Sequence, residues 1–516
     1  MMDLWLMNAI GDVDADLVER AALPPPVRAH RTVNWTAAVA AVLVLAVSVG
    51  VLFGNSGSKP PVTPDVSVSD VSQTTEDTTT TTTEKTTTTT EKTTTTTAQK
   101  LPSRVFAMAT PDYSYLAENR RPDYDSDEYY EWWMEQKQKE KPLETEAKNM
   151  TSFYADTMAA LLRDGKENRV FSPLNLYVAL SMLAETAGGD SRQQILDLLG
   201  QKDLTALRQK NKAIWEGVCR DDDLMVCLLG NSLWLAQDDR AEYNQDTLAT
   251  LAQQYYAAAY RGDMGSEDYN GVLRGWINDH TGGLLSQQSE SVKLDSATAL
   301  ALVSTLYFRG EWIDEFKEED NREGVFHAAT GDVTCTMMYQ KKASYVYTGD
   351  RFTATSINMK DGAGMYIFLP NEGESVASLA SDPQVLTILE SRATYEDRES
   401  VNVYLTLPKF DVVSDMDLSD RLAQMGITDV FNAEKADFSG IFAKQSDAVK
   451  LDRVRQAARV TVDEKGVTAA SFTWMEYGMG GPIEDVEFTV DRPFMFAVIG
   501  PSNTILFAGI IENPNE

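Results

Sequence analysis

Hydrophobic and polar positions divide the chain into regions of very different character. An uncharged, largely apolar run extends from Val33 to Gly54, and a nearly pure threonine tract follows at 74–97. From residue 149 onward the pattern is that of an ordinary globular domain. Apolar residues recur three or four positions apart in its first part, which predicts helices at 152–162, 172–183 and 191–199.

The second part of this domain has the pattern of strands. Short runs rich in β-branched and aromatic residues occur at 365–370, 401–410, 487–490, 494–499 and 505–511. Helices come first and strands follow, with few strict β-α-β units. This order predicts an α+β fold with large sheets.

The apolar run at 33–54 predicts a transmembrane helix, because about 20 apolar residues span the hydrocarbon layer. A cleaved signal peptide is the alternative, but its apolar core of about 7–15 residues should lie closer to the N-terminus. Three arginines precede the run and only Lys59 closely follows it. The positive-inside rule therefore predicts a single-pass protein of the cell membrane, with a cytoplasmic N-terminus and an extracellular C-terminal domain.

Two further regions lie between this run and the globular domain. The threonine tract has no large apolar side chains to offset its ordering entropy, which predicts a disordered, solvated stalk. The region after it is acidic and aromatic. Its aromatic residues either pack on the following domain or form a recognition segment for a partner, and both interpretations stay open. The expected regions are a cytoplasmic tail (1–32), a transmembrane helix (33–54), a stalk (55–100), an extension (101–148) and a globular domain (149–516).

Composition excludes several functions. The net charge of -32 argues against a nucleic-acid partner, which requires a basic surface, and favours a monomer whose copies repel one another. With 3 cysteines and 3 histidines the chain has neither a disulfide framework nor the usual donors of a metal site. No nucleotide-binding motif occurs, so no cofactor is expected.

Catalysis by the chain itself has little support. The only histidines outside the N-terminal tail are His280 and His327, and neither neighbours a nucleophile motif of the G-x-S-x-G kind. Carboxylate pairs are too common in so acidic a chain to identify a site. We therefore expect the protein not to be an enzyme; a hydrolase stays a minor alternative.

The most informative segment runs from Val460 to Phe488, between two strand-like runs. A loop of more than about 15 residues is unusual in a compact domain and points to function. Side chains at alternate positions from Val467 to Tyr477 carry no charge, and no proline occurs before Pro482. The segment is therefore able to become a strand, which makes it a candidate for insertion into a sheet.

On these residues the chain resembles the serpin family, over 149–514. Matching motifs occur in family order at Val170–Gly189, Ser304–Trp312, Val401–Phe410, Met425–Asn432, Ala436–Ile441, Val462–Ser471, Asp491–Ile499 and Ile505–Pro514. The resemblance implies the serpin fold, with three β-sheets, about nine helices and an exposed reactive-centre loop. Together with the expected anchor and the few cysteines, it suggests a membrane-anchored bacterial type.

The resemblance also implies a function. A serpin is a suicide-substrate inhibitor of serine, and in some cases cysteine, endopeptidases. The target cleaves the loop and forms an acyl-enzyme, the loop inserts into the main sheet, and the distorted protease fails to complete hydrolysis. The alternative is a non-inhibitory serpin that acts as a binding or chaperone-like surface protein. Val467 and the bulky Phe472, both unusual for the family, motivate that alternative.

Loop residues take their roles from the family pattern. The hinge consists of Gly466, Val467, Thr468, Ala469, Ala470 and Ser471. Counting from Gly466 places the reactive bond at Gly480–Gly481, with Met479–Gly480 as the next choice. Gly480 offers no side chain to a deep pocket, so Tyr477, Gly478 and Met479 would be read instead. This favours a subtilisin-, elastase- or papain-like target protease over a trypsin-like one.

Residues of the sheet-opening region, where the main sheet would part to admit the loop, are also assigned from the family pattern. Trp312 matches the family tryptophan, and Lys409 with Glu464 matches a family ion pair. The family's usual asparagine and histidine are replaced by Ser304 and Gln456. This polar cluster, completed by Ser172 and Asn175, therefore differs from the family pattern.

Overall fold

Two large sheets organise the part of the chain that the structure describes. The computed structural model describes residues 41–51, 104–122, 126–163, 167–221, 225–237, 241–391, 394–444, 449–466 and 484–516. The described residues from Ala41 onward belong to one compact unit, Ala38–Glu516. Mixed sheets with helices packed on them confirm the expected α+β class.

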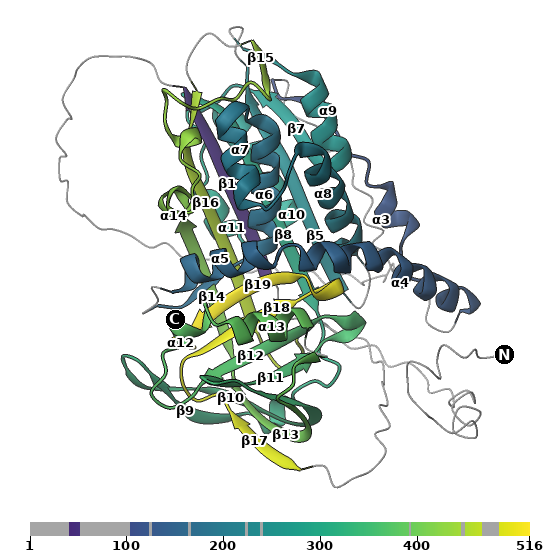
Figure 1. The fold of residues 1–516 in the computed structure, drawn as a ribbon, viewed down its shortest axis with the longest axis vertical. Coiled ribbons are helices and arrows are strands. Elements are labelled where there is room, and N and C mark those ends of the chain that lie inside the picture. The colour runs from purple at the N-terminus through teal and green to yellow at the C-terminus, as the bar shows by residue number, and fades with distance from the viewer. Residues whose placement is uncertain are drawn as a thin grey trace, which may run out of the picture. The chain divides into compact units, whose positions relative to one another are not determined.

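The main sheet contains eight strands and carries the candidate site (Figure 1). In order across the sheet they are β14 (Phe410–Asp417), β16 (Val449–Val462), β1 (Ala41–Val51), β8 (Thr298–Gly310), β5 (Met225–Ala236), β7 (Ala257–Gly262) and β2 (Phe106–Ala109), with β4 (Arg220–Asp221) paired to β5. Strands β8 and β16 are each antiparallel to β1 and hence run parallel to each other.

The second sheet packs at one end of the main sheet and contains nine strands. Its order is β17 (Asp485–Thr489), β13 (Arg398–Pro408), β10 (Gly331–Thr348), β11 (Phe352–Asn358), β12 (Gly364–Pro370), β18 (Phe494–Ile499), β19 (Ile505–Ile511) and β3 (Arg169–Phe171), with β9 (Arg322–Ala328) paired to β10. A small third sheet joins β15 (Phe442–Lys444) to β6 (Glu242–Tyr243).

The described residues form about 12 α-helical segments, where the resemblance to the serpin family implied about nine. Two of the additional segments lie in the extension, and others are single turns that apolar periodicity does not detect. The helices are α3 (Ser114–Glu118), α4 (Asp127–Lys148), α5 (Thr151–Leu162), α6 (Pro173–Thr186), α7 (Gly189–Leu198), α8 (Leu204–Val218), α9 (Gln245–Gln254), α10 (Glu267–His280), α11 (Ser286–Glu290), α12 (Val376–Leu379), α13 (Pro383–Ser391) and α14 (Ser419–Gln424).

Helix α6 forms the centre of the core, and each of its residues is buried. Ser172 caps its N-terminus, with Oγ accepting a hydrogen bond of 3.1 Å from the Asn175 amide, and Pro173 occupies the first helical position. The helix contacts β8 of the main sheet and β19 of the second sheet. It therefore fixes the position of one sheet relative to the other.

The segment expected to be a transmembrane helix has a different structure where the structure describes it. Ala41–Val51 is strand β1 of the main sheet, between β16 and β8. This run has no charge, many valines and apolar residues at consecutive positions. Such a sequence fits a central strand with both faces covered as well as it fits a helix. Among the described residues, no helix is both long and apolar enough to cross a membrane.

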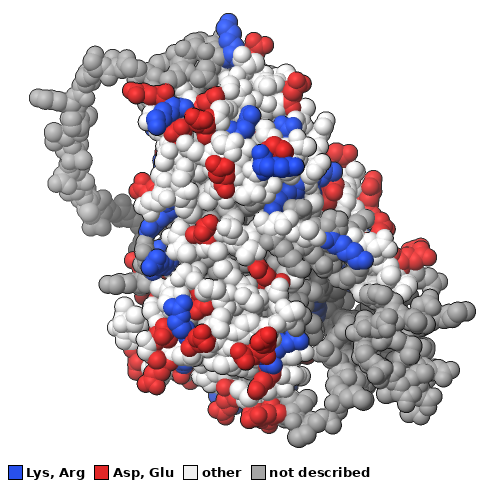
Figure 2. All heavy atoms as spheres, in the orientation of Figure 1, with Lys and Arg blue, Asp and Glu red and all other residues white. Residues whose placement is uncertain are grey.

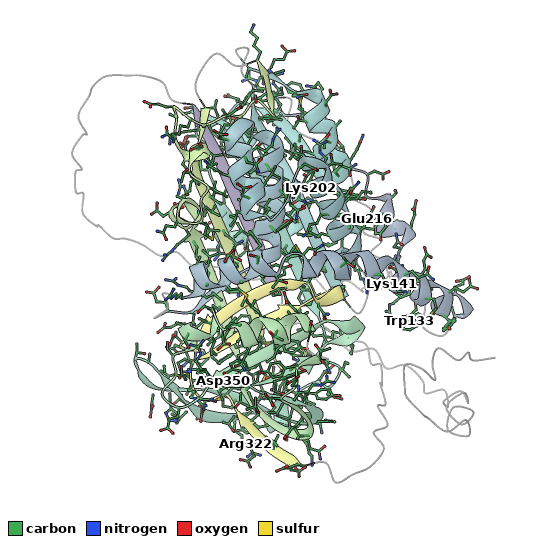
Figure 3. All side chains as sticks on the ribbon, viewed as in Figure 1. Trp133, Lys141, Lys202, Glu216, Arg322 and Asp350 are labelled. Carbon is green, nitrogen blue, oxygen red and sulfur yellow. The ribbon has the colours of Figure 1, made fainter. Side chains whose placement is uncertain are left out.

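The extension packs on the domain through strand pairing and aromatic contacts. Strand β2 pairs antiparallel with β7 and so covers the edge of the main sheet. The Tyr113 ring lies 5.8 Å from that of Trp215 and 6.4 Å from that of Tyr256, and its hydroxyl donates to the Tyr256 carbonyl at 3.3 Å. Figure 3 shows Glu216 on α8 close to α3. These contacts are the ones expected if the aromatic residues of the extension pack on the following domain.

We expect Tyr113→Ala to loosen this edge of the sheet. Loss of the ring removes its stacking and burial, worth about 1–2 kcal/mol, so amide hydrogen exchange in β7 and α8 should become about 5–30-fold faster. Tyr130→Ala is the control, because Tyr130 lies on α4 with 67% of its surface exposed. Unchanged exchange in the Tyr113 variant would contradict the role assigned to the extension.

Candidate functional site

The candidate site lies where β16 ends and the chain turns into the segment 467–483. Trp312, which is only 1% exposed, follows β8 and donates two hydrogen bonds to this turn. Its indole Nε1 donates to the Asp463 carbonyl at 3.0 Å, and its backbone amide donates to the Lys465 carbonyl at 3.3 Å. The amide of Phe316 donates to the Glu464 carbonyl at 2.8 Å. The turn is therefore held by the chain that follows β8.

Gly466 closes the turn in a conformation that favours glycine. Its φ angle is +70°, and a Cβ atom placed there would lie 2.5 Å from the Trp312 amide nitrogen. A residue with a side chain would therefore strain the backbone and clash with Trp312 unless the surroundings rearranged. Gly466 thus lies at the junction between a fixed strand and the chain beyond it, as the hinge assignment requires.

Lys409 and Glu464 form the expected ion pair beside Trp312. Lys409 Nζ lies 2.8 Å from both carboxylate oxygens of Glu464, and Asn321 donates a further hydrogen bond to the same carboxylate. The Glu464 side chain is 7% exposed and that of Lys409 39%. Burial by itself raises the pKa of Glu464, but the hydrogen bonds from Lys409, from the backbone and from Asn321 outweigh it and hold this pKa below its ordinary value.

A buried polar chain links α6 to the middle of the main sheet. Asn175 Nδ2 donates to Ser304 Oγ at 2.8 Å, and Ser304 Oγ donates to Asn231 Oδ1 at 2.7 Å. Asn231 Nδ2 donates in turn to the Tyr255 carbonyl at 2.8 Å. The Asn175, Ser304 and Asn231 side chains are fully buried, so each hydrogen bond satisfies polar atoms that water does not reach.

Gln456 occupies the position where the family usually has histidine. Its Nε2 donates to the Ser172 carbonyl at 3.2 Å, and its Oε1 accepts from the Ser172 amide at 3.4 Å. An amide side chain satisfies both backbone groups without titrating. This contact between β16 and the start of α6 therefore stays the same across physiological pH, where a histidine would change its charge.

Sequence reasoning missed two contributors to this region. Asn231 completes the polar chain, and its only signal was a polar residue inside the apolar run of β5. The ion pair of Glu311 and Lys360, with Nζ to Oε2 at 2.6 Å, is almost fully buried next to Trp312. No spacing rule connects Glu311, which follows β8, with Lys360, which begins a short 3-10 helix.

The remaining loop assignments lie outside the described residues. These are Val467, Thr468, Ala469, Ala470, Ser471, Tyr477, Gly478, Met479, Gly480 and Gly481. The structure resumes at Glu484, and β17 then pairs in parallel with β13, where Asp485 lies opposite Asn402. The two flanks of the segment are thus fixed in different sheets.

The two histidines outside the N-terminal tail have structural contacts. The Nδ1 atom of His280 lies 2.8 Å from the Trp276 carbonyl, and its ring stacks on the Trp276 indole at 4.0 Å. Burial lowers the pKa of His280. His327 lies on β9, and its Nδ1 atom is 2.8 Å from an Asp332 carboxylate oxygen, which raises its pKa. These contacts connect neither ring to a serine or cysteine nucleophile.

The chain belongs to the serpin family, since residues 148–514 match the family model for serpins, serine protease inhibitors. Leukocyte elastase inhibitor of Bos taurus is 29% identical over 383 residues, covering 70% of this chain and 98% of its own. Plasminogen activator inhibitor 1 of Sus scrofa is 26% identical over 394 residues, covering 71% and 92%.

Solved structures show the same fold. The thermophilic serpin tengpin in its native state matches with a TM-score of 0.63 and 19% identity, covering 80% of this chain and all of its own. AtSerpin1 of Arabidopsis, in its native stressed conformation, matches with a TM-score of 0.59 and 22% identity, covering 72% and 99%. The chain therefore belongs to a family of protease inhibitors, which is consistent with the expectation that it is not an enzyme.

We expect Lys409→Met to destabilise the protein at neutral pH by about 1–3 kcal/mol, because it leaves the buried Glu464 carboxylate without its cation. Glu464 has a lowered pKa, so its pairing stabilises the fold above the ordinary value of 4.5 and is lost as the pH falls through the folded-state pKa. The difference between wild type and variant should therefore shrink below about pH 4.5.

Urea unfolding at several pH values measures this difference. Lys444→Met is the control, because Lys444 is exposed on β15. A stability difference independent of pH would show that Lys409 acts through packing and not through the carboxylate.

Proposed function

We propose that the protein is a suicide-substrate inhibitor of endopeptidases, with the segment 467–483 as the reactive-centre loop. One observation carries this proposal. The main sheet accommodates a strand between β8 and β16 that is antiparallel to both, and β16 leads directly into Gly466. A chain that folds back from Gly466 would run in that same direction at that same place.

The dimensions of the sheet also support loop insertion. The arm from Val467 to Gly480, if extended at about 3.3 Å per residue, would span about 46 Å. Strand β16 has 14 residues and so offers a partner over this length. An attached protease would be carried from one end of the main sheet to the other, while the chain beyond Gly481 stays held through β17.

The chemical step belongs to the protease. Its nucleophile would attack the carbonyl carbon of Gly480, and the Gly480–Gly481 bond would break. The new amino group at Gly481 takes up the proton, and Gly480 stays bound to the enzyme as an ester, or as a thioester for a cysteine nucleophile. Insertion before water attacks the ester would distort the protease and stop hydrolysis. Misplacement of catalytic groups by about 1 Å costs about 10²-fold in rate.

The target class follows from the residues around the proposed bond. Gly480 gives a deep primary pocket nothing to bind, whereas Tyr477 and Met479 offer large apolar side chains. Subtilisin-, elastase- or papain-like proteases suit such a sequence. The similarity to leukocyte elastase inhibitor supports an elastase-like target.

A non-inhibitory role is the second candidate, in which the protein binds partners at its surface. Its support is that β1 already lies between β8 and β16, where the loop would insert. In that case proteases would cut the loop without becoming trapped.

Figure 2 shows acidic and basic residues interspersed over the visible face of the described residues, with several acidic groups near the second sheet.

We also propose a surface location, with residues 1–32 in the cytoplasm, a span at 33–54 and the serpin domain outside. The length and the absence of charge in 33–54 support it, as do the arginines before the run. The span and strand β1 share residues 41–51, so anchoring requires that this strand be absent from the sheet.

Incubation with subtilisin and with neutrophil elastase should yield an SDS-stable adduct with the summed mass of protease and loop-cleaved protein. Val467→Arg should abolish the adduct and leave cleavage intact, because a charged residue at the first inserted position opposes entry into the sheet. Val413→Arg is the matched control, because Val413 is 41% exposed on β14. Cleavage of the loop without any adduct, in the wild type and in Val44→Pro alike, would favour the non-inhibitory role.

Cell fractionation tests the location. The full chain should sediment with membranes and resist extraction by high salt or carbonate, and protease added to intact cells should release the serpin domain. Recovery of the intact protein in the soluble fraction after such treatment would contradict the anchor. Replacing Val44 and Val47 by Lys should abolish membrane association if 33–54 spans the bilayer.

A further inference from the structure

Strand β1 is paired along its whole length on both sides. Val42–Val51 runs antiparallel to β16 from Arg459 to Val449, and Ala41–Gly50 runs antiparallel to β8 from Phe308 to Thr298. A single register shift occurs on each side, near Val49. Figure 1 shows β1 in purple between these strands of much later sequence. The N-terminal segment therefore forms an interior strand of the main sheet.

The same position is the one the reactive loop would need. A chain folding back from the turn at Gly466 would lie next to β16 and antiparallel to it, as β1 does. Neighbouring strands lie about 4.8 Å apart, so the gap between β8 and β16 holds one strand only. This step rests on the proposed function, in which the arm Val467–Gly480 enters the sheet. Occupation by β1 and insertion of the arm then exclude each other.

Both faces of this position are covered by apolar layers. On β8, Leu300 and Leu302 belong to the core that contains α6, while Ala301 and Val303 belong to a second cluster with Trp276 of α10. On β16, Val454 lies in the first cluster and Ala457 in the second. A strand placed between β8 and β16 therefore has an apolar layer on each side.

The composition of β1 suits these layers better than that of the loop arm. Its sequence, AVLVLAVSVGV, has no charged residue and no proline, which is typical of a strand buried on both faces. The arm Val467–Gly480 is less uniformly apolar and includes Glu476, whose burial would be costly without a partner. Composition alone thus favours β1 over the arm as the occupant of this position.

The segment around α10 and α11 closes one face of the position. Arg459 Nη1 of β16 donates to the Leu284 carbonyl at 3.3 Å, and Arg455 Nη2 donates to Ser291 Oγ at 2.9 Å. Helix α10 packs on β8 through Trp276. Because this cover contacts the strands on both sides of β1, exchange of one strand for another requires the cover to move.

We propose that Ala41–Val51 is an intrachain competitor of the reactive loop. While it lies between β8 and β16, the protein is cleaved by a protease but does not trap it. Departure of this strand converts the protein into an inhibitor. The N-terminal segment thereby controls the inhibitory activity of the serpin domain.

A disulfide tests whether the strand occupies the sheet in solution. Ala46 lies opposite Val303 in the register of β1 with β8, so the full-length pair Ala46→Cys with Val303→Cys should cross-link under mild oxidation. Mass spectrometry of proteolytic fragments detects the linkage. The native cysteines Cys219, Cys227 and Cys335 are buried, and the pair Val66→Cys with Val303→Cys is the control that should not cross-link.

The same variants test competition. The cross-linked protein should form no SDS-stable adduct with subtilisin or elastase, and reduction should restore the wild-type yield. Val44→Pro places a proline in the interior of β1 and should release it, which raises the rate of adduct formation at least about tenfold. Val66→Pro, outside the strand, should leave the rate unchanged.

The outcomes separate this inference from the proposed function. Adduct formation by the wild type without any cross-link in Ala46→Cys with Val303→Cys would overturn the inference and leave inhibition standing. A cross-linked protein that traps protease as fast as the reduced one would also overturn it. Cross-linking with no adduct from any variant, Val44→Pro included, would defeat the proposed function and the competition with it.

Discussion

The hydrogen bonding of β8 and of β16 to the strand that lies between them is the constraint on which the rest of this structure depends. The two strands are parallel, and an antiparallel strand between them satisfies the backbone groups of both along their length. Trp312, Gly466 and the Lys409–Glu464 pair hold one end of this arrangement, and the Asn175–Ser304–Asn231 chain holds its middle. In the proposed mechanism, inhibition therefore depends on which segment fills that central position.

The Lys409–Glu464 ion pair and the Asn175–Ser304–Asn231 chain differ in whether their strength depends on pH. The ion pair lies at the partly exposed end of the sheet and includes a carboxylate, so its strength depends on pH. The central chain, with Gln456 bonded to the backbone of Ser172, consists of amides and hydroxyls only. Its strength depends on geometry, since no member titrates near neutral pH. Separation of the strands in the middle of the sheet thus requires breaking these bonds, whatever the acidity.

Much of the domain could be predicted because its signals are local. The cap at Ser172, the helical period of α6 and the apolar runs of β12 and β18 each lie within a few residues of the element that they define. The placement of β1 could not be predicted, because apolar length alone suits a bilayer as well as a sheet covered on both faces. Asn231 and the Glu311–Lys360 pair depend on contacts between distant segments, for which one sequence carries no signal.

The covalent link between β1 and the domain has a consequence for how readily the strand returns. Residues 52–105 connect Val51 to β2 along the sequence, so β1 stays covalently attached to the domain with which it pairs. A segment tethered within one chain binds intramolecularly, at an effective concentration on the order of millimolar. No separate peptide at ordinary cellular concentrations would match it. Dilution, which dissociates a bound regulator, would leave this one in place.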